Sequence, residues 1–196
     1  MTDRRNANHS ITLRSRPSGI AGPEHFAEIS QPIRPLDMGE VCVQSLYVSI
    51  DPAMRVWINE APGYVQRVEI GEVMRASGIG RVVESRVPGL EAGDLVSARL
   101  GWQTMPTLPA SAVEKLDLSL GDVEDFLCLL GITGITAYFG LREVARLRPG
   151  ETVLVSGAAG GVGQMVGQIA KIEGCRVIGI AGGAGKCAGQ IGRAHV

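Results

Sequence analysis

The glycine-rich stretch TVLVSGAAGGVG, from Thr152 to Gly163, has the residue types and spacing of a phosphate-binding turn. β-Favouring residues run into glycines at positions 157, 160, 161 and 163, and a helical pattern follows. In such a strand–turn–helix, glycines let the backbone approach a dinucleotide pyrophosphate, while the N–H groups and dipole of the helix face its negative charge. The alternative is a plain strand–helix turn, because 27 of the 196 residues are glycine and chance matches are common.

The residues after the next predicted strand indicate which dinucleotide would bind. Sites for NAD usually place Asp or Glu about 20 residues beyond the glycines, where the carboxylate holds the ribose 2′-hydroxyl. Here the sequence reads IAGGAGK from Ile180 to Lys186, with no acidic residue. A lysine can pair with the 2′-phosphate of NADP(H), so Lys186 is a candidate cofactor ligand. The alternative is that Lys186 is an ordinary solvated lysine.

Charge and composition argue against several classes of partner. The 19 basic and 20 acidic residues give a net charge of −1, and aromatic residues make up 4%, so we expect no nucleic-acid partner. The longest uncharged run, from Phe126 to Leu141, is shorter than a membrane span of about 20 residues, so we expect no membrane partner. The cysteines form no CxxC motif and no apolar leader opens the chain, which favours free thiols and a cytoplasmic location.

The hydrophobic pattern divides the chain into a β-rich region and an α/β region. Short strands broken by Gly and Pro indicate a β-barrel or sandwich in the first region. They are expected over residues 10–14 and 40–50, as two strands on either side of a Gly-rich kink within 71–84, and over 95–100. In the second region, helices are expected over 122–130 and 136–146, then a strand over 152–156, a helix over 162–173 and a strand over 176–180. The last three elements form one βαβ unit, as at the start of a doubly wound parallel sheet.

Five stretches, in this order along the chain, connect the sequence to a known superfamily. They are YVSIDPAMR (47–55), IGEVMRASGIGRVVES (70–85), AGDLVSARLGWQ (92–103), GITGITAYFGL (131–141) and SGAAGGVGQMVGQIAK (156–171). With them the chain resembles the medium-chain dehydrogenase/reductases, in the zinc-independent branch of the leukotriene B4 dehydrogenase/prostaglandin reductases and alkenal double-bond reductases. The resemblance implies an α/β plus β fold, in which a GroES-like β-barrel catalytic domain precedes a Rossmann nucleotide-binding domain.

The same resemblance implies a reaction and a set of cofactor contacts. The reaction is NADPH-dependent reduction of the C=C bond of an α,β-unsaturated ketone or aldehyde by hydride transfer, and the developing enolate oxygen needs a hydrogen-bond donor. The matched cofactor positions are Thr133 and Gly134 beside the nicotinamide, Gly160, Gly161, Val162 and Gly163 at the pyrophosphate, and Lys186 at the 2′-phosphate. No residue of the chain is assigned to the enolate oxygen.

Two loops of the first region bear on metal and substrate. Zinc-dependent relatives place a Cys after the early strand and a Gly-His-Glu run further on, whereas this chain reads SIDP at 49–52 and IGEVM at 70–74, so we expect no metal. Tyr64 falls in the loop that carries a substrate-facing tyrosine in some relatives, with a half-buried packing role as the alternative. Many relatives have tyrosine where this chain has Ala53. The loss of that ring would widen or blunt the substrate pocket. We interpret Asp51 as part of a turn and not as a catalytic acid.

The length of the α/β region sets an expectation about activity. A dinucleotide fold needs two βαβαβ halves, and the predicted elements supply one βαβ unit. We therefore expect a GroES-like domain over 1–120, the first part of a Rossmann domain over 121–187 and a non-native tail over 188–196, in a truncated and inactive fragment. The full-length enzyme would act on a small enone or enal, and a homodimer is one option for it. The alternative is a short β-barrel interaction protein without catalysis.

Overall fold

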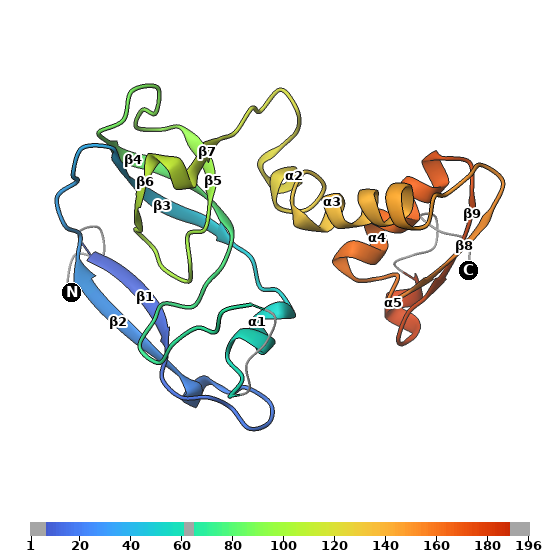
Figure 1. Ribbon diagram of the computed structural model, residues 1–196, viewed down its shortest axis with the longest axis horizontal. Helices are drawn as coiled ribbons and strands as arrows, with labels where there is room; N and C mark the ends of the chain where they lie inside the picture. Colours follow the sequence, from blue (N-terminus) through green and yellow to red (C-terminus); the bar gives the residue numbers. More distant parts are fainter. Residues whose placement is uncertain (1–6, 61–64, 189–196) are drawn as a thin grey trace. The chain divides into compact units, whose positions relative to one another are not determined.

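The computed structural model describes residues 7–60 and 65–188 of the chain. The chain divides into two compact units, residues 1–120 and 121–196 (Figure 1). The first unit is built mainly of antiparallel strands, and the second combines helices with a parallel strand pair. The predicted order of a β domain followed by an α/β domain is therefore confirmed. Within the described residues, none of the helices has the length and apolar character needed to cross a membrane.

A hairpin and a curled sheet make up the first unit. Strands β1 (Ala7–Leu13) and β2 (Phe26–Pro32) form the hairpin, with a 3₁₀ turn over Pro23–His25 before β2. The antiparallel sheet has the order β6-β3-β4-β5-β7. Its strands are β3 (Glu40–Val48), β4 (Gly78–Ser85), β5 (Leu95–Ala98), β6 (Thr107–Pro109) and β7 (Val113–Lys115), with a 3₁₀ turn at Ala110–Ala112. Two irregularities in the β3–β4 register bend the sheet over its core.

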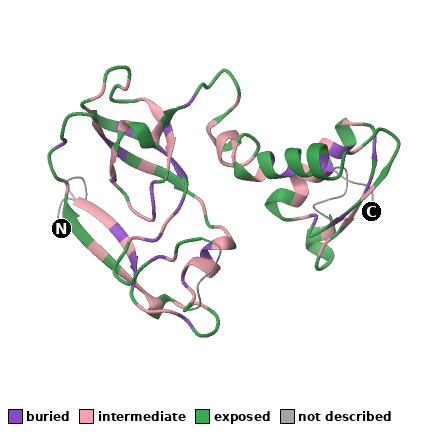
Figure 2. Cartoon of the chain, in the orientation of Figure 1, coloured by how far each residue is buried: buried purple, intermediate pink, exposed green. Residues whose placement is uncertain are grey.

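Two apolar clusters stabilise this unit. One lies inside the curled sheet and consists of Val41, Val43, Val82, Val96 and Leu100, all buried (Figure 2). The other lies beneath the short helix α1 (Ala53–Trp57) and consists of Leu13, Met54, Ile58, Val68, Met74 and Ala76. β1 lies between two other stretches of this unit, because Ile11 N–H donates to the carbonyl of Trp102 at 2.8 Å and Met74 N–H donates to the carbonyl of Ile11 at 2.9 Å.

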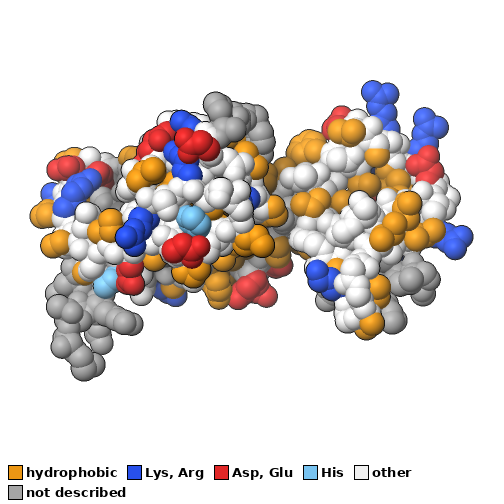
Figure 3. All heavy atoms as spheres, turned by 90° about the horizontal axis from the view of Figure 1, so that it is seen from below, with side chains coloured by type: hydrophobic (Ala, Val, Ile, Leu, Met, Phe, Trp, Pro, Cys, Tyr) orange, Lys and Arg blue, Asp and Glu red, His pale blue; other side chains and the backbone are white. Residues whose placement is uncertain are grey.

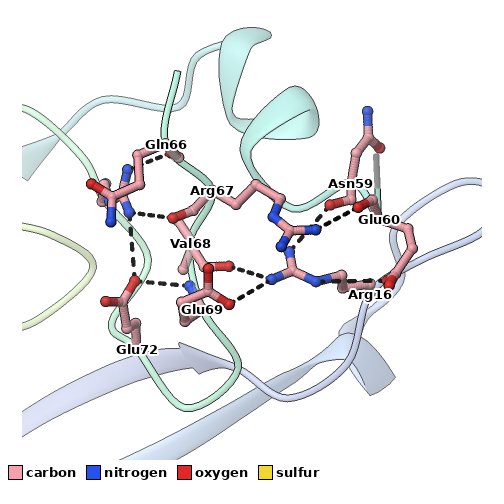
Figure 4. A network of polar contacts seen from close by, with 9 residues as sticks. Arg16, Asn59, Glu60, Gln66, Arg67, Val68, Glu69 and Glu72 are labelled. Carbon is pink, nitrogen blue, oxygen red and sulfur yellow. Dashed lines mark hydrogen bonds and ion pairs between the residues drawn. The ribbon is translucent and has the colours of Figure 1, made fainter. Parts of the chain in front are cut away.

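The side chain of Arg16 fastens both ends of the segment that follows α1 (Figure 4). Its guanidinium, on a side chain only 9% exposed, donates to the carbonyl oxygens of Asn59 at 3.2 Å and Val68 at 3.0 Å. An ion pair with Glu69 at 3.1 Å compensates the charge. A guanidinium carries five N–H donors in one plane, so a single side chain can hold two separate stretches of backbone.

The second unit contains one parallel strand pair and the helices around it. Its elements are α2 (Val123–Leu127), α3 (Ile132–Phe139), a π-helical turn (Gly140–Val144), β8 (Thr152–Ser156), α4 (Gly161–Ile172), β9 (Arg176–Ile180) and α5 (Ala184–Ala188). β8 and β9 pair in parallel, from Thr152 opposite Arg176 to Ser156 opposite Ile180. The bounds predicted for both strands are confirmed. α4 packs on one face of the pair, where Val155, Ala170 and Val177 are buried.

Several elements differ from the sequence prediction. The second helix begins at Ile132 and not at Thr136, because Gly131 forms an extended N-cap and the Thr136 hydroxyl donates to the Ile132 carbonyl at 2.6 Å. Residues 71–76 form no named strand, and Val73 meets β1 in an isolated bridge. The strands β2, β6 and β7 and the helix α5 were not predicted. Ala188, the first residue of the predicted tail, still lies in α5.

Arg146 adopts a left-handed backbone conformation, with φ at 51°, after the π-helical turn. It is the one residue other than glycine with positive φ in the described part of the chain. We expect Arg146→Gly to raise the free energy of unfolding by about 1 kcal/mol, because glycine carries no Cβ penalty there. Glu143→Gly, within the right-handed π-helical turn, should instead lower it. Urea unfolding of the three proteins measures both changes, and a destabilised Arg146→Gly protein would contradict the expectation.

The carboxylate of Glu40, at the start of β3, is held by three hydrogen bonds. Arg34 donates to its two oxygens at 2.8 and 2.6 Å, and the N–H of Asp37 donates at 3.0 Å. The bonds from Arg34, and after them the bond from Asp37, hold the pKa of Glu40 below its ordinary value. A lowered folded-state pKa adds stability above the unfolded-state pKa, and this stability is lost as the pH falls through the folded-state value.

We therefore expect Glu40→Gln to flatten the acid dependence of unfolding. The amide cannot form the ion pair with Arg34, so the variant is less stable than the parent at pH 7. It also loses less stability on acidification, in the range between the unfolded-state pKa of Glu40, about 4.3, and its lower folded-state pKa. Unfolding in urea across pH 3 to 7 measures this. Glu84→Gln, on the neighbouring strand, controls for removal of one carboxylate. Identical acid profiles for Glu40→Gln and the parent would contradict the assignment.

Candidate dinucleotide-binding site

The predicted glycine motif forms the turn between β8 and α4. Gly157 ends the strand with φ at 62°, which favours glycine, and Gly160 is the extended N-cap of the helix. The turn closes through the Gly160 N–H, which donates to the Gly157 carbonyl at 2.9 Å. Predicted contact residues Gly161, Val162 and Gly163 form the first turn of α4. The motif therefore lies at the carboxyl end of a parallel strand, where open α/β sheets bind ligands.

The absence of a side chain at Gly163 lets α4 lie directly against this turn. A Cβ atom there would be 2.8 Å from the Cα of Ala158 and even closer to the carbonyl oxygen of Gly157. Both neighbours are backbone, which cannot move aside as a flexible side chain can. The third glycine of the motif thus fixes how closely the helix approaches the strand end.

Two further contacts hold the turn, and sequence reasoning did not identify them. The N–H of Ala158 donates to the carbonyl of Ile180 at 3.0 Å, which fastens the turn to the end of β9. The side-chain amide of Gln164 donates to the carbonyl of Ala159 at 3.0 Å. A glutamine in a helix is usually a solvated residue, so the sequence carries no signal for the second contact. Together these bonds fasten the turn to the end of β9 and to the first turns of α4.

The structure brings one residue of the preceding helix to the glycine motif. The methyl group of Thr133, in the first turn of α3, would lie 3.3 Å from a Cβ at Gly161. Its hydroxyl donates to the carbonyl of Cys128 at 2.7 Å. Gly134 donates from its N–H to the same carbonyl at 2.9 Å, and the carbonyl oxygen of Leu129 leaves no room for a side chain at Gly134. The structure therefore places Thr133 of the predicted pair beside Gly161 of the glycine motif, with Gly134 next to it in α3.

Lys186 lies on α5, which follows β9, and its side chain is exposed. β8 and β9 are parallel, so α5 and the glycine turn follow the same edge of the strand pair. No acidic residue lies between the end of β9 and Lys186. The charge expected for a 2′-phosphate contact is present, and the contact itself stays a prediction.

The chemistry available at this edge is anion binding. The first N–H groups of a helix have no partner within it, and they carry a partial positive charge. Gly160, the N-cap of α4, has no side chain to occupy these donors. The turn therefore suits a phosphate or pyrophosphate group, with Lys186 as a further cation.

The substrate and metal predictions fall on the first unit. Tyr64 lies outside the described residues. Asp51 accepts a hydrogen bond from the Ser49 hydroxyl at 2.7 Å, and its carbonyl accepts one from the N–H of Met54 at the start of α1. The described residues contain no group of three His, Cys, Asp or Glu side chains placed to hold a metal ion. The imidazole of His9 lies 3.6 Å from the carboxylate of Glu28.

An open pocket of about 480 Å³ lies between the β1–β2 hairpin and residues 102–104. Its lining is largely apolar and includes Val48, Ile50 and Trp102. None of the predicted site residues that the structure describes lines this pocket. The candidate site is therefore the glycine turn, and the pocket is a separate feature of the first unit.

Comparison with known proteins decides the family. Residues 9–116, more than half of the chain, match the family described as the N-terminal domain of oxidoreductase. The chain belongs to the medium-chain dehydrogenase/reductases. The family prediction made from the five sequence stretches is confirmed. In this chain the matched domain, residues 9–116, precedes the glycine turn, whereas the similarity to whole relatives extends over both.

Three relatives show how much of a medium-chain reductase the chain spans. YfmJ of Bacillus subtilis (strain 168), named as an NADP-dependent oxidoreductase, is 44% identical over 172 residues, 88% of this chain and 50% of that protein. The NADP(+)-dependent 2-alkenal reductase of Nicotiana tabacum is 38% identical over 74% of this chain and 43% of that protein. The solved structure of CurA from Vibrio vulnificus with NADPH gives a TM-score of 0.87 at 38% identity, over 93% of this chain and 54% of that one. The chain spans about half the length of these relatives.

Two glycines of α4 provide a matched test of the close approach. We expect Gly163→Ala to destabilise the second unit by about 1–3 kcal/mol, because its Cβ meets backbone atoms that cannot yield. Gly167→Ala, one turn further along, would place its Cβ at an ordinary 3.8 Å from Val177. It should stabilise the helix by about 0.5–1 kcal/mol through helix propensity. Thermal unfolding followed by circular dichroism distinguishes the two, and equal effects would refute the account of the turn.

Proposed function

We propose that this chain is part of an NADPH-dependent reductase that reduces the C=C bond of α,β-unsaturated ketones and aldehydes by hydride transfer, without zinc. The glycine turn at the end of β8, with helix donors on a backbone too tightly packed for side chains, carries the proposal. The similarity to CurA, solved with NADPH, and to a plant 2-alkenal reductase supports the cofactor and the substrate class. The loops at 49–52 and 70–74, which lack Cys and His, support the zinc-independent reaction.

The residues of the chain would bind and orient the reactants. The N–H groups of Gly161, Val162 and Gly163 would face the pyrophosphate, and Lys186 the 2′-phosphate. When bound, NADPH supplies the hydride that adds to the β-carbon of the substrate. Thr133 would act through its methyl group, which lies beside Gly161, because its hydroxyl already donates to the Cys128 carbonyl. It would thereby help to position α3 beside the turn where the reactants are to meet.

The test is a chimera in which this chain continues into the second half of Vibrio vulnificus CurA. We expect it to bind NADPH saturably and to reduce an enal such as a 2-alkenal, with activity that survives chelation of metals. Gly163→Ala should remove cofactor binding from the chimera. A chimera that folds, as judged by cooperative unfolding, and binds no NADPH would overturn the proposal.

Cofactor preference provides a second measurement on the same chimera. We expect Lys186→Glu to weaken NADPH binding at least about tenfold and to leave NADH binding within about twofold, because only NADPH carries the 2′-phosphate. Lys171→Glu makes the same change of net charge in the last turn of α4, at the opposite end of the helix from the glycine turn. It should leave the ratio of the two affinities unchanged. Equal losses for NADPH and NADH in Lys186→Glu would remove Lys186 from the site.

A further inference from the structure

The glycine turn carries no charged side chain, so its affinity for an anion depends on the direction of its peptide dipoles. Residues 156–164 read SGAAGGVGQ, without Asp, Glu, Lys, Arg or His. Figure 3 shows the second unit at the right, where white backbone and uncharged polar side chains cover much of the surface. In such a turn an N–H group that faces a phosphate attracts it, and a carbonyl oxygen that faces it repels it. The groups that hold the carbonyls of the turn therefore take part in binding.

The peptide group between Ala159 and Gly160 is held at both of its ends. Its N–H donates to the carbonyl of Gly157 at 2.9 Å. Its carbonyl accepts a hydrogen bond from the side-chain amide of Gln164 at 3.0 Å. Because the N–H and C=O of a planar trans peptide point in opposite directions, the two bonds together set the rotation of this group. The N–H groups of the first turn of α4 then remain available to a ligand.

The bond from Gln164 opposes a rotation that glycine would otherwise permit. Gly160 is the exposed N-cap of α4, and without a Cβ its backbone has more freedom than that of other residues. Gln164 lies within α4, so its amide holds the Ala159 carbonyl toward the helix, in the direction of the helical carbonyls. A reversed peptide would turn this oxygen outward, to the side where the first N–H groups meet an anion.

We infer that Gln164 is a positioning residue of the dinucleotide site, whose amide keeps the Ala159 carbonyl turned away from the pyrophosphate. Its half-buried side chain acts through the backbone of the turn and not by contact with the ligand. The inference rests on the cofactor site of the proposed function and adds a residue to it. NADPH and NADH both carry the pyrophosphate, so Gln164 affects both cofactors equally, whereas Lys186 is expected to affect NADPH alone.

The experiment compares Gln164→Met with Gln168→Met in the CurA chimera. Methionine has a helix propensity close to that of glutamine and lacks the amide donor. Gln168 is the matched control, because its exposed amide donates to the Gln164 carbonyl at 3.2 Å, one turn further from the glycines. We expect Gln164→Met to raise the Kd of NADPH and of NADH by the same factor, at least about threefold, the worth of one hydrogen bond. The kcat at saturating cofactor should stay within about twofold, and Gln168→Met should leave both Kd values within about twofold.

Titration of the 196-residue chain with inorganic pyrophosphate tests the same role without reductase activity. In NMR spectra of the isotope-labelled chain, the amide resonances of Gly161 and Val162 should shift as pyrophosphate binds. The Kd should be at least about threefold higher in Gln164→Met than in Gln168→Met. Circular dichroism before each titration establishes that the variants are equally folded.

Three results would overturn the inference: equal binding by Gln164→Met and the parent, a loss confined to NADPH, or amide resonances that do not respond to pyrophosphate. The first two leave the proposed function standing, because the parent chimera still binds NADPH. A folded parent chimera that binds no NADPH counts against the proposed function, and the pyrophosphate titration then decides the role of Gln164 by itself.

Discussion

The close approach of α4 to the turn after β8 is the constraint on which the second unit depends. It places the backbone of Gly157 and Ala158 against Gly163, where no side chain fits. The same approach aims the first N–H groups of α4 at the carboxyl edge of the strand pair, where an anion can meet them. The absence of a Cβ atom at Gly163 therefore determines both how α4 packs and where its N–H donors point. The contact of Thr133 with Gly161 extends this arrangement to the preceding helix.

Local signals explain which parts of the fold could be predicted. β8 and β9 are short apolar runs between turn residues, and α4 is bounded by glycines, so their limits can be read from neighbouring residues alone. The strands β2, β6 and β7 lie at the edges of their sheets, and their side chains are mostly exposed or half-buried. These strands form because their backbones pair with strands far away in the sequence, as Thr107 does with Cys42. A local residue pattern cannot reveal such a pairing.

The residues of the candidate site likewise fall into those that the sequence predicted and those that it did not. The glycines and Thr133–Gly134 were predicted, partly from the motif and partly from family resemblance, and the structure places Thr133 beside Gly161. The bonds of Gln164 and Ala158 were missed, since an amide in a helix and a backbone N–H in a turn have no distinctive sequence signal. The sequence supplies the charge of Lys186 but does not specify which group its flexible side chain reaches. Tyr64 lies outside the described residues. Prediction from sequence is strongest where glycine is required and weakest where contacts are long-range.

In the first unit, the hydrogen bonds of Arg16 hold together two stretches of backbone that are separated in sequence. The guanidinium binds the backbone at Asn59 and at Val68, so these two points stay together whatever chain connects them. Lengthening a loop whose ends are already fixed costs little, about 0.6 kcal/mol for each doubling. An insertion between these two points would therefore cost little and leave the packing of the apolar cluster at α1 in place. The largely buried guanidinium of Arg16 thereby makes the packing of this region less dependent on the length of the segment that follows α1.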